Sequence, residues 1–226
     1  MAQRFDAVSL DVGGVLVVPD HGALAGALVA AGIGHDRSRF GVGHYLAMAA
    51  MDRAASLPED FTDYLWGFLA AVEVPEGDRV VAHQKLTDVL RTPIWCQPVP
   101  ASRAGVQALA DARVRLAVTS NSDGTIADHL RRHEWVQVGE GPGVAVEVVT
   151  DSGVVGVGKP DRRVFQATID ALGLAPERIL HIGDSVHYDV EGAAAVGMQT
   201  VHMDPYALCS SRAHAHVSAL GDLLPP

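Results

Sequence analysis

The sequence predicts an α/β fold in which a doubly wound parallel sheet has a helical domain inserted after its first strand. From residue 98 onward, short apolar runs alternate with segments of helical periodicity, a pattern that favours parallel strands joined by right-handed crossovers. Residues 18–97 show mainly helical periodicity. We therefore expect a core domain built from residues 1–17 and 98–226, and a helical domain built from residues 18–97.

The first strand is expected over residues 5–10, an apolar run that stops at Asp11. Gly13 and Gly14 then indicate a tight turn before a second short extended segment. Helical periodicity follows over about residues 20–90. Its breaks leave room for four helices of modest length, and they fall at residues 32–34, 57–58 and 74–77.

The remainder of the chain alternates between the two kinds of element. Helices are expected at residues 102–111, 122–133, 161–172 and 189–196. Strands are expected at residues 114–119, 179–182 and 200–203, with a glycine-rich stretch of partial strand character that ends at Thr150. Gly173 and Gly197 follow two of these helices, at the position where a left-handed residue commonly ends a helix.

Composition limits the kind of protein and its partners. The 226-residue chain is 48% hydrophobic and 19% charged, as in a globular protein, and has no uncharged apolar run of about 18 residues that could cross a membrane. Asp6 and Asp11 interrupt the first apolar run, so we expect no signal peptide and a cytoplasmic location. The two cysteines, Cys96 and Cys209, are too few for a disulfide framework and lack metal-like spacing. A formal charge of −10 without a basic run argues against nucleic acid.

Polar residues follow several predicted strands, where the ligand crevice of a doubly wound sheet lies. Asp11 follows the first strand, and Ser120 and Asn121 follow the strand that ends near residue 119. Asp184 follows a later strand, and Lys159 lies directly before a predicted helix. Carboxylates, a hydroxyl, an amide and a lysine at one edge of a sheet indicate metal-assisted phosphoryl transfer.

These residue types suit that chemistry because a phosphoryl group brings negative charge, which cations and hydrogen-bond donors must neutralise before a carboxylate can approach. Mg²⁺ binds one or two carboxylates together with carbonyl, phosphate and water oxygens. Asp11 can then act as nucleophile and metal ligand, forming an aspartyl phosphate that water hydrolyses. Ser120 and main-chain N–H groups around Gly14 would bind phosphate oxygens, and Lys159 would neutralise charge.

Four ordered motifs resemble those of the haloacid dehalogenase superfamily of hydrolases. They occupy residues 8–15 (VSLDVGGV), 116–121 (LAVTSN), 158–161 (GKPD) and 182–189 (IGDSVHYD). The resemblance implies a Rossmann-like catalytic core, with residues 18–97 as a helical cap domain. It also implies a Mg²⁺-dependent phosphatase that acts on a small phosphorylated molecule. From charge and composition we expect no nucleic-acid or membrane partner, and the sequence does not predict the oligomeric state.

The resemblance assigns roles to individual residues. Asp11 and Lys159 correspond to the family's catalytic pair. The metal ligands would be Asp11, the carbonyl group of Gly13, Asp184 and Asp189, the last acting through water or by orienting Lys159. The phosphate group would be bound by Gly14, Ser120, Asn121 and Lys159.

Gly13 departs from the family pattern, because phosphatases of this family usually have a second aspartate at this position. Glycine keeps the main-chain carbonyl but lacks the acid that protonates the leaving group, a loss that typically costs about 10² to 10⁴ in rate. His21 and His187 are candidates to replace this acid. Two other activities of the family stay open. Dehalogenating members have an aromatic residue at this position and do not need the acidic pair that Asp184 and Asp189 form here. Phosphonate-cleaving members have alanine at this position and use a cap lysine, and Lys85 is the only lysine in the expected cap. A weakly catalytic phosphate-binding or interaction protein is the third alternative.

The remaining histidines predict no further site. His129 and His133 lie one helical turn apart, but the charged residues between them indicate a solvated face. His214 and His216 lie near the C-terminal end and are expected at the surface.

Overall fold

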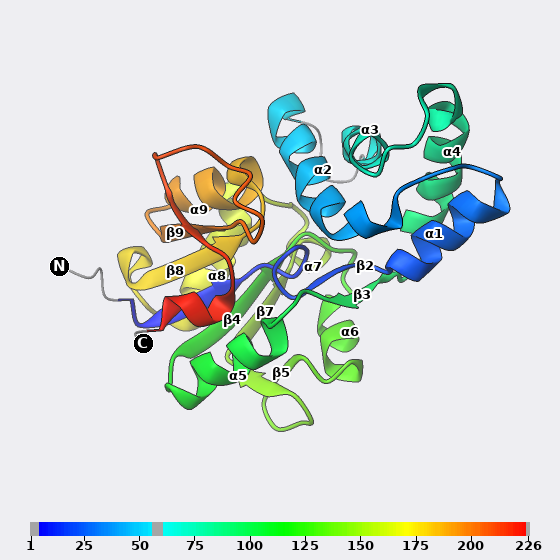
Figure 1. Cartoon of the computed structure of the whole chain (residues 1–226). Coiled ribbons are helices and arrows are strands. Elements are labelled where there is room, and N and C mark those ends of the chain that lie inside the picture. Colours follow the sequence, from blue (N-terminus) through cyan, green and yellow to red (C-terminus); the bar gives the residue numbers. More distant parts are fainter. Residues whose placement is uncertain (1–4, 56–60, 225–226) are drawn as a thin grey trace. The chain divides into compact units, whose positions relative to one another are not determined.

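The computed structural model describes residues 5–55 and 61–224 (Figure 1). The chain divides into two compact units. The sheet unit comprises Met1–Leu16 and Val99–Pro226, and the helical unit comprises Val17–Pro98. The break expected at residues 57–58 lies outside the described residues.

A six-stranded sheet forms the centre of the sheet unit, in the order β10-β9-β8-β1-β4-β7. Its strands are β1 (Ala7–Leu10), β4 (Arg115–Ser120), β7 (Val148–Asp151), β8 (Ile179–Gly183), β9 (Gln199–Met203) and β10 (Ala215–Val217). All neighbouring strands in it run parallel. This topology confirms the predicted fold class.

Helices cover the sheet on both sides. They are α5 (Ser102–Asp111), α6 (Ile126–Arg132), α7 (Ser152–Val155), α8 (Arg162–Leu172) and α9 (Gly192–Ala194), and Figure 1 shows α5 and α8 on opposite sides of the sheet. Phe165 and Ile169 of α8 belong to one hydrophobic core with Ala7 and Ala117 of the sheet. Because both faces are covered, β1 and β8 are buried along their whole length.

The strand register aligns the carboxyl ends of the central strands. Leu10, the last residue of β1, pairs with Val118 of β4 and with Ile182 of β8. The segments that follow β1, β4 and β8 therefore leave the sheet at one edge, where the sequence predicts the functional residues.

Two helix boundaries differ from the prediction, and side-chain caps explain both. α6 begins at Ile126 rather than near residue 122, because the Asp151 carboxylate accepts hydrogen bonds from the main-chain N–H groups of Gly124 and Ile126. The helix expected at residues 189–196 begins earlier, as a π-helical turn over Val186–Glu191 that continues into α9. The hydroxyl group of Ser185 caps this turn by accepting a hydrogen bond from the N–H of Tyr188.

The hydrophobic pattern of the sequence did not predict three short strands. β5 (Val136–Val138) and β6 (Val144–Val146) form a small parallel pair, and β10 forms one edge of the main sheet. Each has only three residues, too few to show an alternating pattern.

The described residues of the helical unit form the four expected helices and one antiparallel strand pair. The elements are α1 (His21–Ala30), α2 (Phe40–Ala54), α3 (Thr62–Ala71), α4 (Arg79–Leu90), β2 (Val17–Pro19) and β3 (Trp95–Pro98). Phe40 and Phe68 are fully buried in its core, with their rings edge to face and the ring centroids 5.2 Å apart. Among the described residues, no helix is long and apolar enough to span a membrane.

Candidate active site

Three buried aspartates meet at the carboxyl edge of the sheet. Asp11 follows β1, where its main-chain N–H donates a hydrogen bond to the carbonyl of Ile182 over 2.9 Å. Asp184 follows β8, and Asp189 lies on the π-helical turn. One carboxylate oxygen from each aspartate lies within 4.8 Å of the others. Such a set of buried oxygen donors can bind a metal ion.

Lys159 supplies the positive charge among these carboxylates. Its Nζ atom lies 2.8 Å from Oδ1 of Asp11 and 2.6 Å from Oδ1 of Asp189, and the lysine side chain is 3% exposed. Burial opposes its charge, but the contacts with Asp11 and Asp189 raise the pKa of Lys159 above its ordinary value. The ammonium group therefore stays charged.

The single positive charge of Lys159 does not balance the negative charges of three aspartates, and the pKa of Asp11 reflects the excess negative charge. Burial raises the pKa of Asp11 to about 7, Lys159 opposes this rise, and the charges of Asp189 and Asp184 add to it. A bound cation would relieve this repulsion. Both the donor atoms of the site and its excess negative charge thus fit a metal ion.

Two glycines allow the carboxylates to approach the main chain. Gly14 has a φ of 63°, and a Cβ atom there would lie 2.0 Å from an oxygen of Asp184. A Cβ atom on Gly183 would lie 2.0 Å from Cγ of Asp189. No side chain fits at either position without displacing a candidate ligand, so the site depends on both glycines.

Asp189 is held by three donors. It accepts hydrogen bonds from Lys159, from Nε2–H of His181 over 3.0 Å and from the main-chain N–H of Ser185 over 3.2 Å. Burial favours the neutral acid, but Lys159 and His181 together hold the pKa of Asp189 below its usual range. Asp189 is therefore an ionised anchor for the lysine.

A chain of buried hydrogen bonds lies beneath this anchor, and sequence reasoning missed it. Nδ1 of His181 lies 3.1 Å from the hydroxyl oxygen of Ser9, which lies 2.8 Å from that of Thr119. The chain continues to Thr168 and then to Thr150. The sequence did carry a signal for it. Ser9, Thr119 and His181 are each a polar residue inside an apolar run, and the register places the three strands side by side.

The side chain of Asn121 is hydrogen-bonded to the main chain of Lys159. Its side-chain oxygen accepts a hydrogen bond from the main-chain N–H of Lys159 over 2.7 Å, and its amide group donates to the Lys159 carbonyl over 3.1 Å. The sequence predicts phosphate binding by this side chain. Both polar groups of the side chain contact the main chain of Lys159, and phosphate binding by Asn121 stays a prediction.

Ser120, Gly13 and Gly14 lie at the same edge as Asp11. Ser120 ends β4, is buried and pairs with Asp151 of β7. The Asp151 carboxylate accepts main-chain hydrogen bonds from Gly124 and Gly153, so it fixes the loops that follow both strands. The left-handed residue of the first turn is Gly14.

The two histidines considered as proton donors differ in their surroundings. His21 belongs to the helical unit, where its Nδ1 atom pairs with the side-chain amide of Gln97 at 2.9 Å. His187 belongs to the sheet unit, is one-third exposed and has Nδ1 3.4 Å from Glu191. Both rings have partners of their own.

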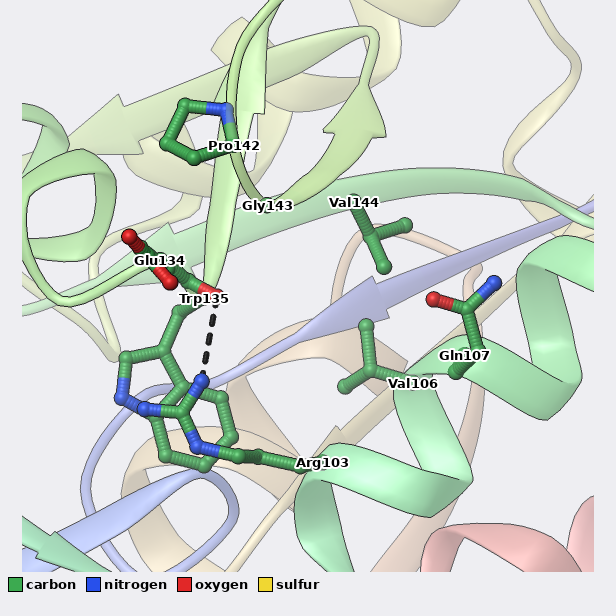
Figure 2. Close-up of a pocket in the computed structure, with 8 residues that line it drawn as sticks. All are labelled: Arg103, Val106, Gln107, Glu134, Trp135, Pro142, Gly143 and Val144. Atoms are coloured by element: carbon green, nitrogen blue, oxygen red, sulfur yellow. Dashed lines mark hydrogen bonds between the residues drawn. The ribbon is translucent and has the colours of Figure 1, made fainter.

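A surface pocket of about 180 Å³ lies elsewhere in the sheet unit (Figure 2). Its lining includes Arg103, whose guanidinium lies 3.9 Å from the centre of the Trp135 ring and donates to the carbonyls of His133 and Glu134. The only cation in its lining is thus already engaged. None of the candidate site residues lines this pocket.

Comparison with known proteins shows the family to which the chain belongs. A model of haloacid dehalogenase-like hydrolases matches residues 5–197, and the chain belongs to that family. Phosphoserine phosphatase of Thermus thermophilus is 35% identical to it over 131 residues, which are 58% of this chain and 48% of that protein. The chain spans about half the length of curated relatives such as this one.

Solved structures share the fold over nearly the whole chain. The HAD-hydrolase YfnB of Bacillus subtilis, bound to magnesium, has a TM-score of 0.65 and 17% identity, with 97% of each chain covered. The crystal structure of a dehalogenase has a TM-score of 0.61 and 16% identity, covering 99% of this chain and 97% of that chain. At such identities the likeness concerns the fold alone.

Proposed function

We propose that this chain is a Mg²⁺-dependent phosphatase that hydrolyses a small phosphorylated metabolite in the cytoplasm through an aspartyl phosphate on Asp11. The observation that supports this most is the contact of Lys159 with Asp11 beside two further buried aspartates. Dehalogenation needs no such acidic group, whereas phosphoryl transfer needs a concentrated positive charge near the nucleophile. The similarity to a phosphoserine phosphatase agrees with this choice.

The reaction has two steps. In the first, an oxygen of Asp11 attacks phosphorus while the ester P–O bond breaks, and the leaving oxygen takes up a proton from water. In the second, water attacks the aspartyl phosphate, which releases inorganic phosphate and restores the carboxylate. Lys159 offsets negative charge in both steps, and the Ser120 hydroxyl and main-chain N–H groups around Gly14 bind phosphoryl oxygens.

The residues that would hold Mg²⁺ are Asp11, Asp184 and the carbonyl of Gly13. When bound, the ion supplies positive charge to the phosphoryl oxygens. Asp189, also predicted as a ligand, would act mainly through Lys159, because one of its oxygens already accepts from both Lys159 and His181.

The helical unit would act as the cap that selects the substrate. Its lysine Lys85 lies exposed on α4. A lysine that forms a Schiff base needs a desolvated amine with a lowered pKa. The exposure of Lys85 therefore favours phosphate ester hydrolysis over phosphonate cleavage.

A substrate screen tests the proposal. The purified chain is assayed for phosphate release from an aryl phosphate, phosphoserine, sugar phosphates and nucleoside monophosphates, with Mg²⁺ or with EDTA. A parallel assay measures halide release from 2-haloacids. We expect phosphate release that EDTA abolishes, and no halide release.

The matched variants are Asp184→Asn in the site and Asp222→Asn at the exposed C-terminal turn. The first should lose Mg²⁺-dependent activity and the second should retain it. Halide release that is insensitive to EDTA would assign the chain to the dehalogenase type, and absence of both activities would favour a binding protein.

A further inference from the structure

A second cluster of metal-ligand side chains lies outside the proposed active site. It consists of His202, Cys209, His214 and His216, with one imidazole nitrogen of each histidine and the sulfur of Cys209 all within 4.8 Å of one another. From the sequence, the spacing of the two cysteines predicts no metal site. His214 and His216 lie near the C-terminal end, which predicts that they are surface residues. The structure instead gathers both histidines beside the buried His202, because β10 returns to pair with β9.

The backbone brings the four residues together. His202 on β9 pairs with His216 on β10 in parallel register, so the two side chains leave the same face of the sheet. Asp204 follows β9, and its carboxylate accepts hydrogen bonds from the main-chain N–H groups of Leu208 and Cys209. The connecting segment, orange to red in Figure 1, is thereby folded back so that Cys209 joins the histidines.

His202 has one nitrogen prepared for a ligand. Its Nε2–H donates to the main-chain carbonyl of Asp184 over 3.0 Å, which leaves Nδ1 with a free electron pair. This Nδ1 atom is buried, and no hydrogen-bond partner reaches it within the described part of the chain. A ring that donates one N–H to a carbonyl and presents its other nitrogen is the usual arrangement of a metal-binding histidine.

The other members agree with this arrangement. Nε2 of His216 is also buried and has no hydrogen-bond partner among the described residues. The three imidazole rings converge, with centroids 4.7 to 5.4 Å apart.

The distances and atom types favour zinc. Bond lengths of about 2.3 Å to sulfur and 2.05 Å to nitrogen place these atoms about 3.6 Å apart in a tetrahedral Zn²⁺ site. The Sγ atom of Cys209 lies 3.6 Å from Nε2 of His214. The cluster contains no carboxylate, so magnesium and calcium, which prefer oxygen ligands, fit it poorly.

We propose that His202, Cys209, His214 and His216 form a tetrahedral Zn²⁺ site that ties the C-terminal segment to β9. On binding, the Cys209 thiol releases its proton and the sulfur coordinates the ion as a thiolate. Through His202, the ion would also fix the main chain at Asp184. This site is distinct from the carboxylate cluster, and it does not depend on the phosphatase proposal.

Cobalt substitution tests the site without an activity assay. The purified chain is stripped of metal, saturated with Mg²⁺ to fill the carboxylate site, and titrated with Co²⁺. We expect one equivalent to give the intense visible bands of tetrahedral Co²⁺ and a near-ultraviolet charge-transfer band that requires a thiolate ligand. One equivalent of Zn²⁺ should abolish both.

Matched variants assign the ligands. Cys209→Ser should lose the charge-transfer band, and Cys96→Ser, which changes the other cysteine, should retain it. His214→Ala should weaken binding at least about tenfold, whereas His133→Ala, in a histidine pair with centroids 4.5 Å apart, should not. Zn²⁺ should also raise the Tm of the wild-type chain but not that of Cys209→Ser.

Two results would overturn the proposal. One is a wild-type spectrum with only the weak bands of six-coordinate Co²⁺. The other is a charge-transfer band that persists in Cys209→Ser or disappears in Cys96→Ser. If Cys209→Ser does not fold, the charge-transfer band is measured in Cys209→Ala instead. The number of Co²⁺ equivalents that the wild-type chain binds then gives a second test of the site.

Discussion

Nζ of Lys159 lies 2.8 Å from Oδ1 of Asp11, although one residue follows the first strand and the other lies in a loop far along the chain. The contact places a fixed positive charge on the proposed nucleophile. It depends on two supports for the lysine: Asn121 holds its main chain, and Asp189 holds its ammonium group. Both supports can be tested separately from the nucleophile.

Replacing Asn121 with alanine should lower kcat about 10- to 100-fold, because the main chain of Lys159 loses two hydrogen bonds and the ammonium group shifts. Steady-state kinetics with a fixed aryl phosphate measure the effect. The control is Gln107→Ala, which removes an exposed amide on α5. Equal kcat values in both variants would contradict a positioning role for Asn121.

Replacing His181 with leucine should lower the free energy of unfolding by about 1–3 kcal/mol, because Asp189 and Ser9 each lose a buried hydrogen-bond partner. It should also lower kcat, since Asp189 holds Lys159. Urea unfolding and kinetics are measured on the same preparation. His181→Gln, which can still donate to Asp189, should recover part of the lost kcat. A kcat equal to that of the wild type in the leucine variant would mean that the hydrogen bond does not position the lysine.

The stability of the metal-free protein should depend on the proton of Asp11. Its pKa in the folded chain is raised to about 7, mainly by burial, from an unfolded value of 3.8. A raised carboxyl pKa contributes stability that is complete below the unfolded pKa and is lost as the pH rises through about 7. Asp11→Asn has no such proton to lose.

In EDTA at pH 8, Asp11→Asn should therefore melt about 5 °C above the wild-type protein, with a smaller difference at pH 5. Mg²⁺ should raise the wild-type Tm at pH 8 and reduce the gap. Thermal unfolding followed by circular dichroism at both pH values measures this. The same gap at pH 5 and pH 8 would show that the Asp11 carboxyl has no raised pKa.

The rate of hydrolysis should depend strongly on the leaving group, because Gly13 supplies no acid to protonate it. Without a carboxyl group there, aryl phosphates should be hydrolysed much faster than phosphoserine, a primary alkyl ester, because the better leaving group needs less protonation. Gly13→Asp should reduce this difference. The turn should accept the substitution, since its left-handed residue is Gly14. If wild-type rates on the two esters are equal and unchanged in the variant, another acid exists, and His187 and His21 are the first residues to replace.

The fold and the strand-end residues could be predicted from the sequence because their signals are local. Apolar runs mark β1, β4 and β8, and parallel strands necessarily bring Asp11, Ser120 and Asp184 to one edge. The helix end at Gly173 was predicted for the same reason, and this glycine follows α8 with a positive φ. Gly197 also has a positive φ, but α9 ends earlier, at Ala194.

The missing parts depend on contacts between distant segments. The tasks of Asn121 and His181 follow from side-chain hydrogen bonds that no spacing reveals. The cluster around His202 depends on β10, a three-residue strand without a periodic signal. Its ligands are spread over residues 202–216, and only the pairing of β9 with β10 brings them together.

The most direct test of the phosphatase mechanism is the covalent intermediate itself. The wild-type protein is mixed with an aryl phosphate and Mg²⁺, quenched with acid during turnover and digested, and the peptides are analysed by mass spectrometry. The mechanism predicts one phosphoryl group on the peptide that contains Asp11, absent in Asp11→Asn and absent when EDTA replaces Mg²⁺. Rapid phosphate release by an Asp11→Asn variant, or a phosphoryl group on any other residue, would contradict it.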